Sequence, residues 1–174
     1  MIHVVISQLS AALQEGVVRP IRSDLAPVSP GARDLGQQAG PEVEERLRQG
    51  GRLPVGGAVI TPGGALGAVF LIHVVTCSED EPQSALSVQR ALRNGLRRAR
   101  DWGLKSLALP PLGIGVGTMD AEDAARAQVE ILVNHIDEGH PPLDLTIVVA
   151  NAYEEEIFSR LAGELMGERF PMRN

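Results

Sequence analysis

Residues 109–118 read LPPLGIGVGT, and this stretch decides how the rest of the chain is interpreted. It follows an apolar run of strand length, residues 106–109, and precedes a helical pattern that begins near residue 121. Glycines at positions 113, 115 and 117 leave backbone N–H groups uncovered, and glycine can take the positive φ angles that such a loop needs. A loop of this kind beside a helix N-terminus is well suited to hold phosphate. By itself the stretch fits a simple turn equally well, so the flanking sequence is needed to distinguish a phosphate-binding loop from a turn.

Outward from this loop the chain alternates between strand and helix patterns. Apolar runs of strand length fall at residues 2–6, 16–21, 58–61, 69–77, 106–109 and 143–150. Helical patterns fall at residues 31–49, as one helix or two, and at 82–102, 121–137 and 153–165. Pro41 is well placed for a first helical turn. This order predicts one α/β domain over residues 1–174, with a mostly parallel or mixed sheet and helices on both of its faces.

Composition excludes several classes of protein. Of the 174 residues, 44% are hydrophobic and 22% are charged, which is typical of a globular domain. The longest apolar stretch, residues 65–75, is too short to span a bilayer, and residues 1–10 lack the pattern of a signal peptide, so we expect no membrane partner. The single cysteine, Cys77, allows no internal disulfide and fits a reducing compartment. A cytoplasmic location is therefore expected.

The net charge of -6 argues against general nucleic-acid binding, which needs a basic surface. One local exception is a stripe of arginines at helical spacing, Arg90, Arg93, Arg97 and Arg100. We interpret this stripe as a solvated helix face, with docking of an anionic partner as the alternative.

The histidines and the cysteine have structural interpretations. His135 and His140 lack the spacing of a zinc pair on a helix, and Cys77 has no partner ligand, so we expect no metal site and no cofactor. His73 lies within a predicted strand and is interpreted as a packed core histidine rather than a catalytic base. Cys77 is interpreted as an inert thiol, because no His and Asp constellation can be named that would activate it.

The segments around the loop resemble the macro domain family. Residues 56–63, GGAVITPG, and residues 70–75, FLIHVV, are similar to the family's G-x-A-x-I-T-x-G pattern and to its following strand, which ends I-H-x-V. Residues 39–42 resemble the family's A-G-P-E helix start, and residues 109–117 resemble its second phosphate loop. Together these blocks have the order and spacing of the family and cover nearly the whole chain, which makes them more specific than any single motif.

The resemblance implies a three-layer α/β/α fold with a mixed central sheet and a cleft for ADP-ribose or a related adenine nucleotide, free or attached to an ADP-ribosylated protein. The loop that begins at Gly113 would wrap the diphosphate and the distal ribose with its backbone N–H groups. On this basis we predict the following ligand-binding residues: Gln8, Leu9, Arg19, Arg22, Ser29, Gly31, Ala32, Pro110, Gly113, Ile114, Gly115, Val116, Gly117, Thr118, Asn151 and Tyr153.

The chain departs from the family where hydrolytic members carry their catalytic groups. Counting back without gaps from residues 39–41, the family's N-A-A-N signature falls on residues 19–22, RPIR, and its first phosphate loop on residues 27–31, PVSPG. The asparagine and aspartate that serve ADP-ribosyl hydrolysis in one large subgroup would fall on Arg22 and Ala32, and neither can do that work. We therefore predict a binding module with no standard catalytic residue.

Two other functions stay open. One is a hydrolase of ADP-ribosyl groups or of O-acetyl-ADP-ribose that uses other residues, with Asp34 and Asp120 as the nearby carboxylates. The other is an interaction domain that kept the fold and lost nucleotide binding through the changes at residues 19–22. A calorimetric titration beside a hydrolysis assay would separate all three.

The edges of the expected cleft carry further candidates. Gln8 stands where the family often has an aspartate that reads the adenine amino group, and its amide still offers a donor and an acceptor. Asn151 and Tyr153 would line the adenine ring, although Asn151 is equally suited to cap a helix. Arg19 and Arg22 would replace the lost first loop if a turn at the intervening proline brought both inward. The alternative for both arginines is solvation, or pairing with Asp24 and Asp34.

Overall fold

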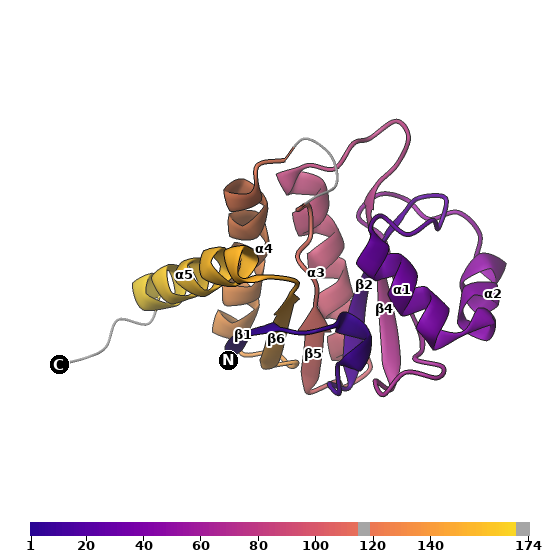
Figure 1. The fold of residues 1–174 in the computed structure, drawn as a ribbon, viewed down its shortest axis with the longest axis horizontal. Helices are drawn as coiled ribbons and strands as arrows, with labels where there is room; N and C mark the ends of the chain where they lie inside the picture. The colour runs from indigo at the N-terminus through magenta and orange to yellow at the C-terminus, as the bar shows by residue number, and fades with distance from the viewer. Residues whose placement is uncertain (115–118, 170–174) are drawn as a thin grey trace.

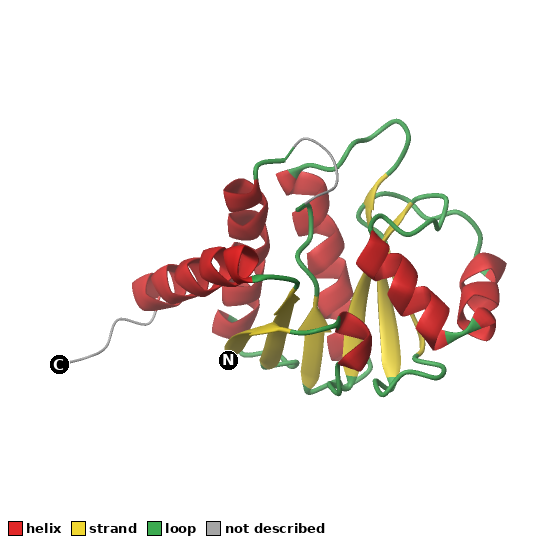
Figure 2. Ribbon diagram, in the orientation of Figure 1, coloured by secondary structure: helices red, strands yellow, loops and turns green. Residues whose placement is uncertain are grey.

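The computed structural model describes residues 1–114 and 119–169, and it shows a mixed sheet flanked by helices (Figures 1 and 2). The strands are β1 (Ile2–Ile6), β2 (Gly16–Arg22), β3 (Ala58–Pro62), β4 (Phe70–Cys77), β5 (Ser106–Leu109) and β6 (Asp144–Val149). The helices are the 3-10 turn η1 (Leu9–Ala11) and α1 (Pro30–Ala39), α2 (Pro41–Gln49), α3 (Ala85–Asp101), α4 (Ala121–Asp137) and α5 (Ala152–Arg169). Each predicted strand and helix is present, and η1 is an addition to them.

The sheet has the strand order β1-β6-β5-β2-β4-β3. All neighbouring pairs are parallel except β3 and β4, so the one antiparallel strand lies at an edge. Parallel strands that are neighbours in a sheet have their carboxyl ends on the same side. The segments that follow β1, β6, β5, β2 and β4 therefore emerge along one edge of the sheet.

The helices form a layer on each side of the sheet, which confirms the predicted three-layer α/β/α fold (Figure 2). Alternate residues of β2 point to opposite layers. Val17 packs with Leu35 under α1, and Ile21 packs with Leu47 under α2. Val18 belongs instead to the cluster that the sheet forms with α3, α4 and α5.

Local signals explain where the helices begin and end. The predicted helical region over residues 31–49 splits at Gly40, whose φ of 107° interrupts helical geometry, and Pro41 then occupies the first turn of α2 as predicted. Helix α3 begins at Ala85 because Ser84 caps it: the Ser84 hydroxyl accepts from the Ser87 N–H at 3.1 Å, and the Ser87 hydroxyl accepts from the Ser84 N–H at 2.9 Å.

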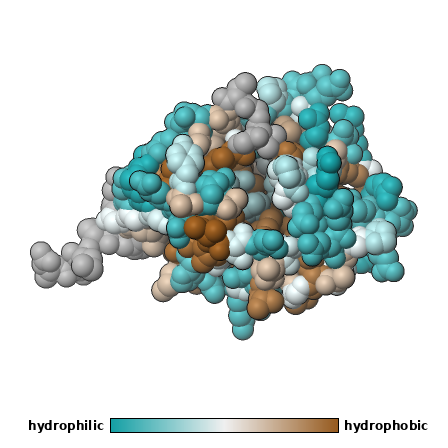
Figure 3. Space-filling model, viewed as in Figure 1, coloured by the Kyte–Doolittle hydropathy of each residue, from teal (hydrophilic) through white to brown (hydrophobic). Residues whose placement is uncertain are grey.

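The hydropathy of the surface differs between helices α1 and α2 and the part of the sheet beside them. Figure 3 shows mainly hydrophilic residues over α1 and α2, and apolar residues over β1 and between α5 and α1. Within the described residues, none of the helices is long and apolar enough to cross a membrane.

Candidate ligand-binding cleft

The carboxyl edge of the sheet brings together segments that the sequence separates widely. Gln8 follows β1, Arg22 ends β2, Pro110 follows β5 and Asn151 follows β6. These four strands are consecutive in the sheet, so their following segments lie next to one another (Figure 1). In open α/β sheets, ligands bind outside the carboxyl ends of the strands. This edge is therefore the candidate site.

The segment that follows β5 is held by a buried glutamine of α4. The Gln128 amide nitrogen donates to the Pro110 carbonyl at 3.0 Å, and its amide oxygen accepts from the Leu112 N–H at 2.8 Å. Gln128 is fully buried, so both bonds are shielded from water. Gly113 then turns the chain with a φ of 88°, the positive angle that the glycine-rich pattern predicts. The predicted ligand residues Gly115, Val116, Gly117 and Thr118 lie outside the described residues.

The first turn of α4 already has an anion at its positive end. The Asp120 carboxylate accepts from the backbone N–H groups of Glu122 and Asp123 at 3.0 and 3.3 Å, so it caps the helix. Glu122 and Asp123 add two more acidic side chains to the same turn. These charges oppose a phosphate at the helix terminus itself, because like charges at short range repel. A diphosphate at this edge would have to be held by the loop that begins at Gly113.

The segment between β2 and α1 folds into a capped turn. Leu25 has a φ of 75°, and its N–H donates to the Arg22 carbonyl at 2.9 Å. The Ser29 hydroxyl accepts from the Ala32 N–H at 3.1 Å, so Ser29 caps α1. Ser29 is thus a helix cap, and a ligand-binding role for it stays a prediction. Gly31 is exposed in the first turn, where a side chain would meet open space.

The structure gives Arg19 a role that differs from the predicted one. The residue is 1% exposed, its Nε donates to the Ala32 carbonyl at 2.8 Å, and its Nη2 lies 2.7 Å from a Glu44 carboxylate oxygen. Burial lowers the pKa of Arg19, and the nearby Glu44 carboxylate raises it in partial compensation. Arg19 therefore ties the sheet to α1 and α2 and is not placed to meet a diphosphate at the sheet edge.

Arg22 ends the same strand, at a point where the pairing with β4 becomes irregular. Strand β2 is continuous through Pro20, so the structure has no turn there, and the register of β2 with β4 shifts between Ile21 and Arg22. The Arg22 guanidinium lies 3.7 Å from the Asp24 carboxylate, which is one of the two partners expected for it. Its side chain is 38% exposed, so it is the arginine of the pair that a solvent-side ligand could reach.

The segments after β1 and β6 form the other end of the edge. Ser7 donates its N–H to the Val149 carbonyl at 3.2 Å, which fixes the two segments together. Asn151 caps α5, since its amide oxygen accepts from the Glu154 N–H at 3.0 Å. Gln8 is exposed and Tyr153 is 63% exposed, so an amide and an aromatic ring stand available to solvent here. Their predicted contact with adenine stays a prediction.

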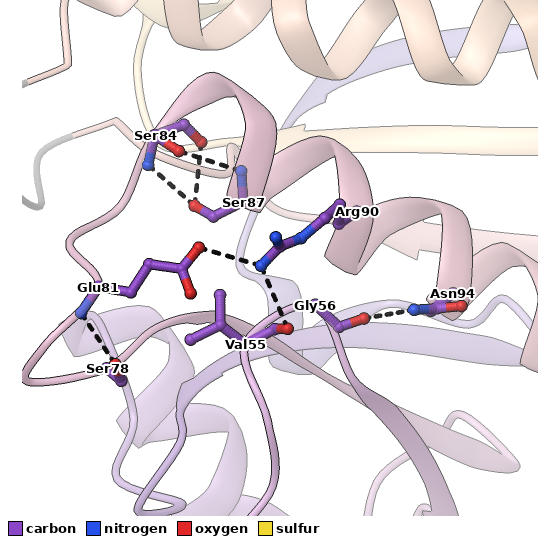
Figure 4. Close-up of polar contacts among 8 residues, drawn as sticks. All are labelled: Val55, Gly56, Ser78, Glu81, Ser84, Ser87, Arg90 and Asn94. Carbon is purple, nitrogen blue, oxygen red and sulfur yellow. Dashed lines mark hydrogen bonds and ion pairs between the residues drawn. The ribbon is translucent and has the colours of Figure 1, made fainter.

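The loop between β4 and α3 is braced by polar contacts (Figure 4). Glu81 donates its N–H to the Ser78 hydroxyl at 3.0 Å, and its carboxylate lies 3.0 Å from the Arg90 guanidinium. Arg90 also donates to the Val55 carbonyl at 3.3 Å, so one cation joins this loop to the segment before β3. The first arginine of the predicted stripe is therefore a brace within the fold.

One buried residue of that loop stands outside the predicted site. Gln83 is 7% exposed, and neither its amide nitrogen nor its amide oxygen has a hydrogen-bond partner among the described residues. The sequence does carry a signal for it, a polar residue just before the capping Ser84, but composition alone does not distinguish a buried glutamine from an exposed one.

The described residues hold no group of three or more His, Cys, Asp or Glu side chains that could bind a metal ion. His135 is instead bonded through its Nε2 to the Pro142 carbonyl at 2.9 Å. His73 is fully buried and its Nε2 lies 2.9 Å from the Thr61 hydroxyl, in keeping with a packed core histidine.

The fold and the position of the loop define a three-layer α/β/α domain with its candidate site at the carboxyl edge of a mixed sheet. More particularly, the chain belongs to the macro domain family, whose model matches residues 30–128.

Relatives and solved structures agree with that assignment. An uncharacterized protein from Aeropyrum pernix is 34% identical over 127 residues, which are 72% of this chain and 67% of the relative. A relative from Mycobacterium tuberculosis is 33% identical over 60% of this chain, but the match covers only 29% of that protein. A macrodomain mutant from Oceanobacillus iheyensis superimposes with a TM-score of 0.85 at 20% identity, covering 95% of this chain and 92% of that one. A macrodomain from Trypanosoma brucei in complex with ADP gives a TM-score of 0.83 at 16% identity, covering 93% and 69%.

Proposed function

We propose that this chain is a binding module for ADP-ribose or a close derivative of it, free or attached to a protein, and that it lacks standard hydrolase activity. The observation that carries the proposal is the segment after β5, where Gln128 fixes Pro110 and Leu112 so that Gly113 begins a turn at the carboxyl edge. These two bonds fix residues 110–112, from which the glycine-rich loop leaves the sheet, and a fixed starting point lowers the cost of ordering a loop on binding.

The ligand class follows from what similar structures hold. Among solved structures with this fold, the Oceanobacillus iheyensis macrodomain is described with ADP and, as a mutant, with ADPR, and the Trypanosoma brucei macrodomain with ADP. Bonds from backbone N–H groups to a charged phosphate contribute about 1.5–3 kcal/mol each, so a few of them give micromolar affinity, which corresponds to about 8 kcal/mol. The exposed Gln8 and Tyr153 at the other end of the edge suit an adenine ring.

The two carboxylates nominated for a hydrolase, Asp34 and Asp120, each make a contact within the protein. By the family resemblance Ala32 stands where the hydrolytic aspartate would be, and it offers only backbone groups, which bond to Ser29 and Arg19. Asp34 accepts from the Gln38 amide at 3.1 Å, and Asp120 caps α4. A positioned general base typically accelerates proton transfer by about 10²- to 10⁴-fold. We therefore expect hydrolysis of ADP-ribosylated protein to be absent or very slow.

The test is a calorimetric titration of the protein with ADP-ribose, paired with a hydrolysis assay on ADP-ribosylated protein. Micromolar binding without turnover supports the module. Repeated turnovers that follow the protein through purification would establish the hydrolase alternative instead, and the absence of both would leave the interaction domain.

A charge change in the glycine-rich loop sharpens the same test. By the family resemblance, Gly115→Glu puts a carboxylate where the diphosphate binds, and the repulsion should lower the affinity for ADP-ribose by at least about tenfold. Gly163→Glu is the matched control, because Gly163 is exposed on α5 and a side chain there meets open space. If both folded variants bind equally well, the ligand does not occupy this loop.

A further inference from the structure

Two buried glutamines flank the start of the loop after β5, and they differ in one respect. Gln128 has a partner for its amide nitrogen and another for its amide oxygen, both in the backbone of residues 110–112. Gln83 comes from the loop between β4 and α3, and its amide nitrogen lies 3.5 Å from where a Cβ on Gly113 would lie. Neither polar atom of Gln83 is bonded among the described residues. Both polar atoms of Gln128 therefore have a partner, whereas neither polar atom of Gln83 has one among the described residues.

An unpaired amide at this depth is costly. A buried polar group without a partner destabilises a fold by about 1–3 kcal/mol, and native proteins satisfy nearly all such groups. A flexible side chain would swing toward water to avoid that cost. The backbone on both sides of Gln83 is anchored, just before it by the Glu81 ion pair with Arg90 and just after it by the Ser84 cap of α3 (Figure 4). Its amide is buried beside the turn at Gly113.

The position of Gln83 along the carboxyl edge of the sheet indicates which part of the proposed ligand it would contact. The exposed Gln8 and Tyr153 follow β1 and β6, and Gly113 follows β5, whereas Gln83 follows β4. In the order β1-β6-β5-β2-β4 a ligand with adenine at the first end and diphosphate over β5 has its second sugar toward β4. Gln83 is thus on the side of the distal ribose.

The chemistry of the amide agrees with that position. A carboxamide presents a donor and an acceptor side by side. A pair of neighbouring ribose hydroxyls can accept from the amide nitrogen and donate to the amide oxygen together. A phosphate offers only acceptors, so it would leave the Gln83 oxygen unpaired and facing negative charge.

We propose that Gln83 is a specificity-determining residue that binds the hydroxyl pair of the distal ribose and distinguishes ADP-ribose from ADP. The inference rests on the proposed function, and it adds a contact from the loop between β4 and α3. It also accounts for an amide that the fold leaves unpaired, since the ligand completes its hydrogen bonds.

The test compares Gln83→Met, which keeps length and volume but cannot hydrogen bond through an amide, with the parent protein. Calorimetric titrations with ADP-ribose and with ADP are run on both, beside thermal unfolding. Loss of two neutral hydrogen bonds should weaken ADP-ribose binding by about 5- to 100-fold. Binding of ADP should be unchanged, and the melting temperature should stay level or rise, because no bond within the protein is lost.

Gln83→Leu provides a second apolar variant in case the methionine packs poorly. An unchanged affinity of either folded variant for ADP-ribose overturns the inference, as does an equal loss for ADP-ribose and ADP. If the parent itself does not bind ADP-ribose, the proposed function fails together with this inference. If the parent binds and the Gln83 variants match it, only this inference fails.

Discussion

The two faces of the sheet are built differently. On the side of α3 and α4 the buried residues form one large apolar cluster that runs from Val18 to Ala162. On the side of α1 and α2 the apolar residues form two smaller clusters, one around Leu35 and one around Leu47. Arg19 and His73 are paired in the sheet between these two clusters, so buried polar groups divide the second face.

The polar groups of this face depend on one another. Arg19 pairs with Glu44, whose side chain is still 32% exposed, so the ion pair runs from the core to the surface. His73 bonds to Thr61 on the adjacent strand β3. Burial and, secondarily, the Arg19 charge lower the pKa of His73 to about 3, so its ring stays neutral.

The contrast shows how a segment can exchange a binding role for a structural one. By the resemblance, residues 19–22 occupy the place of a ligand-binding signature, yet Arg19 contributes its guanidinium to the packing of α1 and α2. Substitutions that break the Arg19 contacts with α1 and α2 should therefore lower the free energy of unfolding. Substitutions of exposed residues should change it much less.

The largest effect is expected for Glu44→Ala. Without this carboxylate the buried Arg19 guanidinium has no counter-ion and keeps only its bond to the Ala32 carbonyl, and removing one partner of a buried pair costs about 3–5 kcal/mol. Urea unfolding of parent and variant measures the difference. Glu45→Ala is the control, since Glu45 pairs with Arg48 at 3.6 Å with both side chains more than half exposed, and such pairs contribute about 0–1 kcal/mol. Equal effects of the two substitutions would show that the Arg19 pair is no more important than a surface pair.

A second effect concerns pH. His73 is neutral in the folded protein and protonates with a pKa of about 3, whereas its ordinary value is 6.5. Below pH 6.5 His73 binds a proton in the unfolded chain but not in the folded protein. The free energy of unfolding therefore falls as the pH drops toward 3, by up to about 1.4 kcal/mol per pH unit.

The measurement is urea unfolding at pH 7 and pH 5, on the parent and on His73→Gln, which keeps a polar group facing Thr61. Over this interval the parent should lose about 2 kcal/mol more than the variant. His135, whose pKa burial also lowers, contributes to both proteins and cancels in the difference. Parallel losses in the two proteins would mean that His73 is not held neutral by the fold.

The sequence predicts the architecture well because the signals are local. Strand lengths, Pro41 at a helix start and the positive φ of Gly113 all depend on a few neighbouring residues. The alternation of strand residues also predicts that Arg19 shares a face with Val17 and Ile21, and a ligand-binding role for both arginines required a turn at Pro20, which the continuous strand does not have.

The parts that the sequence does not predict depend on distant partners. Gln83 and Gln128 are both buried glutamines, and only the fold shows that Leu112 and Pro110 satisfy one of them. Likewise Glu44 is one of several acidic residues of α2, and the approach of Arg19 from the sheet selects it.

A third effect concerns a glycine within α1, and it distinguishes the helix preference of a residue from its packing. Glycine inside a helix is less favourable than alanine by about 1 kcal/mol, so replacing it usually stabilises a protein. Gly36 is an exception, because a Cβ there would collide with the Arg19 guanidinium and the Glu44 carboxylate. Gly36→Ala should therefore lower the unfolding free energy by about 1–3 kcal/mol, as overpacking does.

The control is Gly163→Ala on α5, where the added methyl group meets open space and should raise the unfolding free energy by up to about 1 kcal/mol. Opposite signs in urea unfolding would show that the ion pair crosses α1 at Gly36, and stabilisation by both substitutions would show that it can move aside without cost.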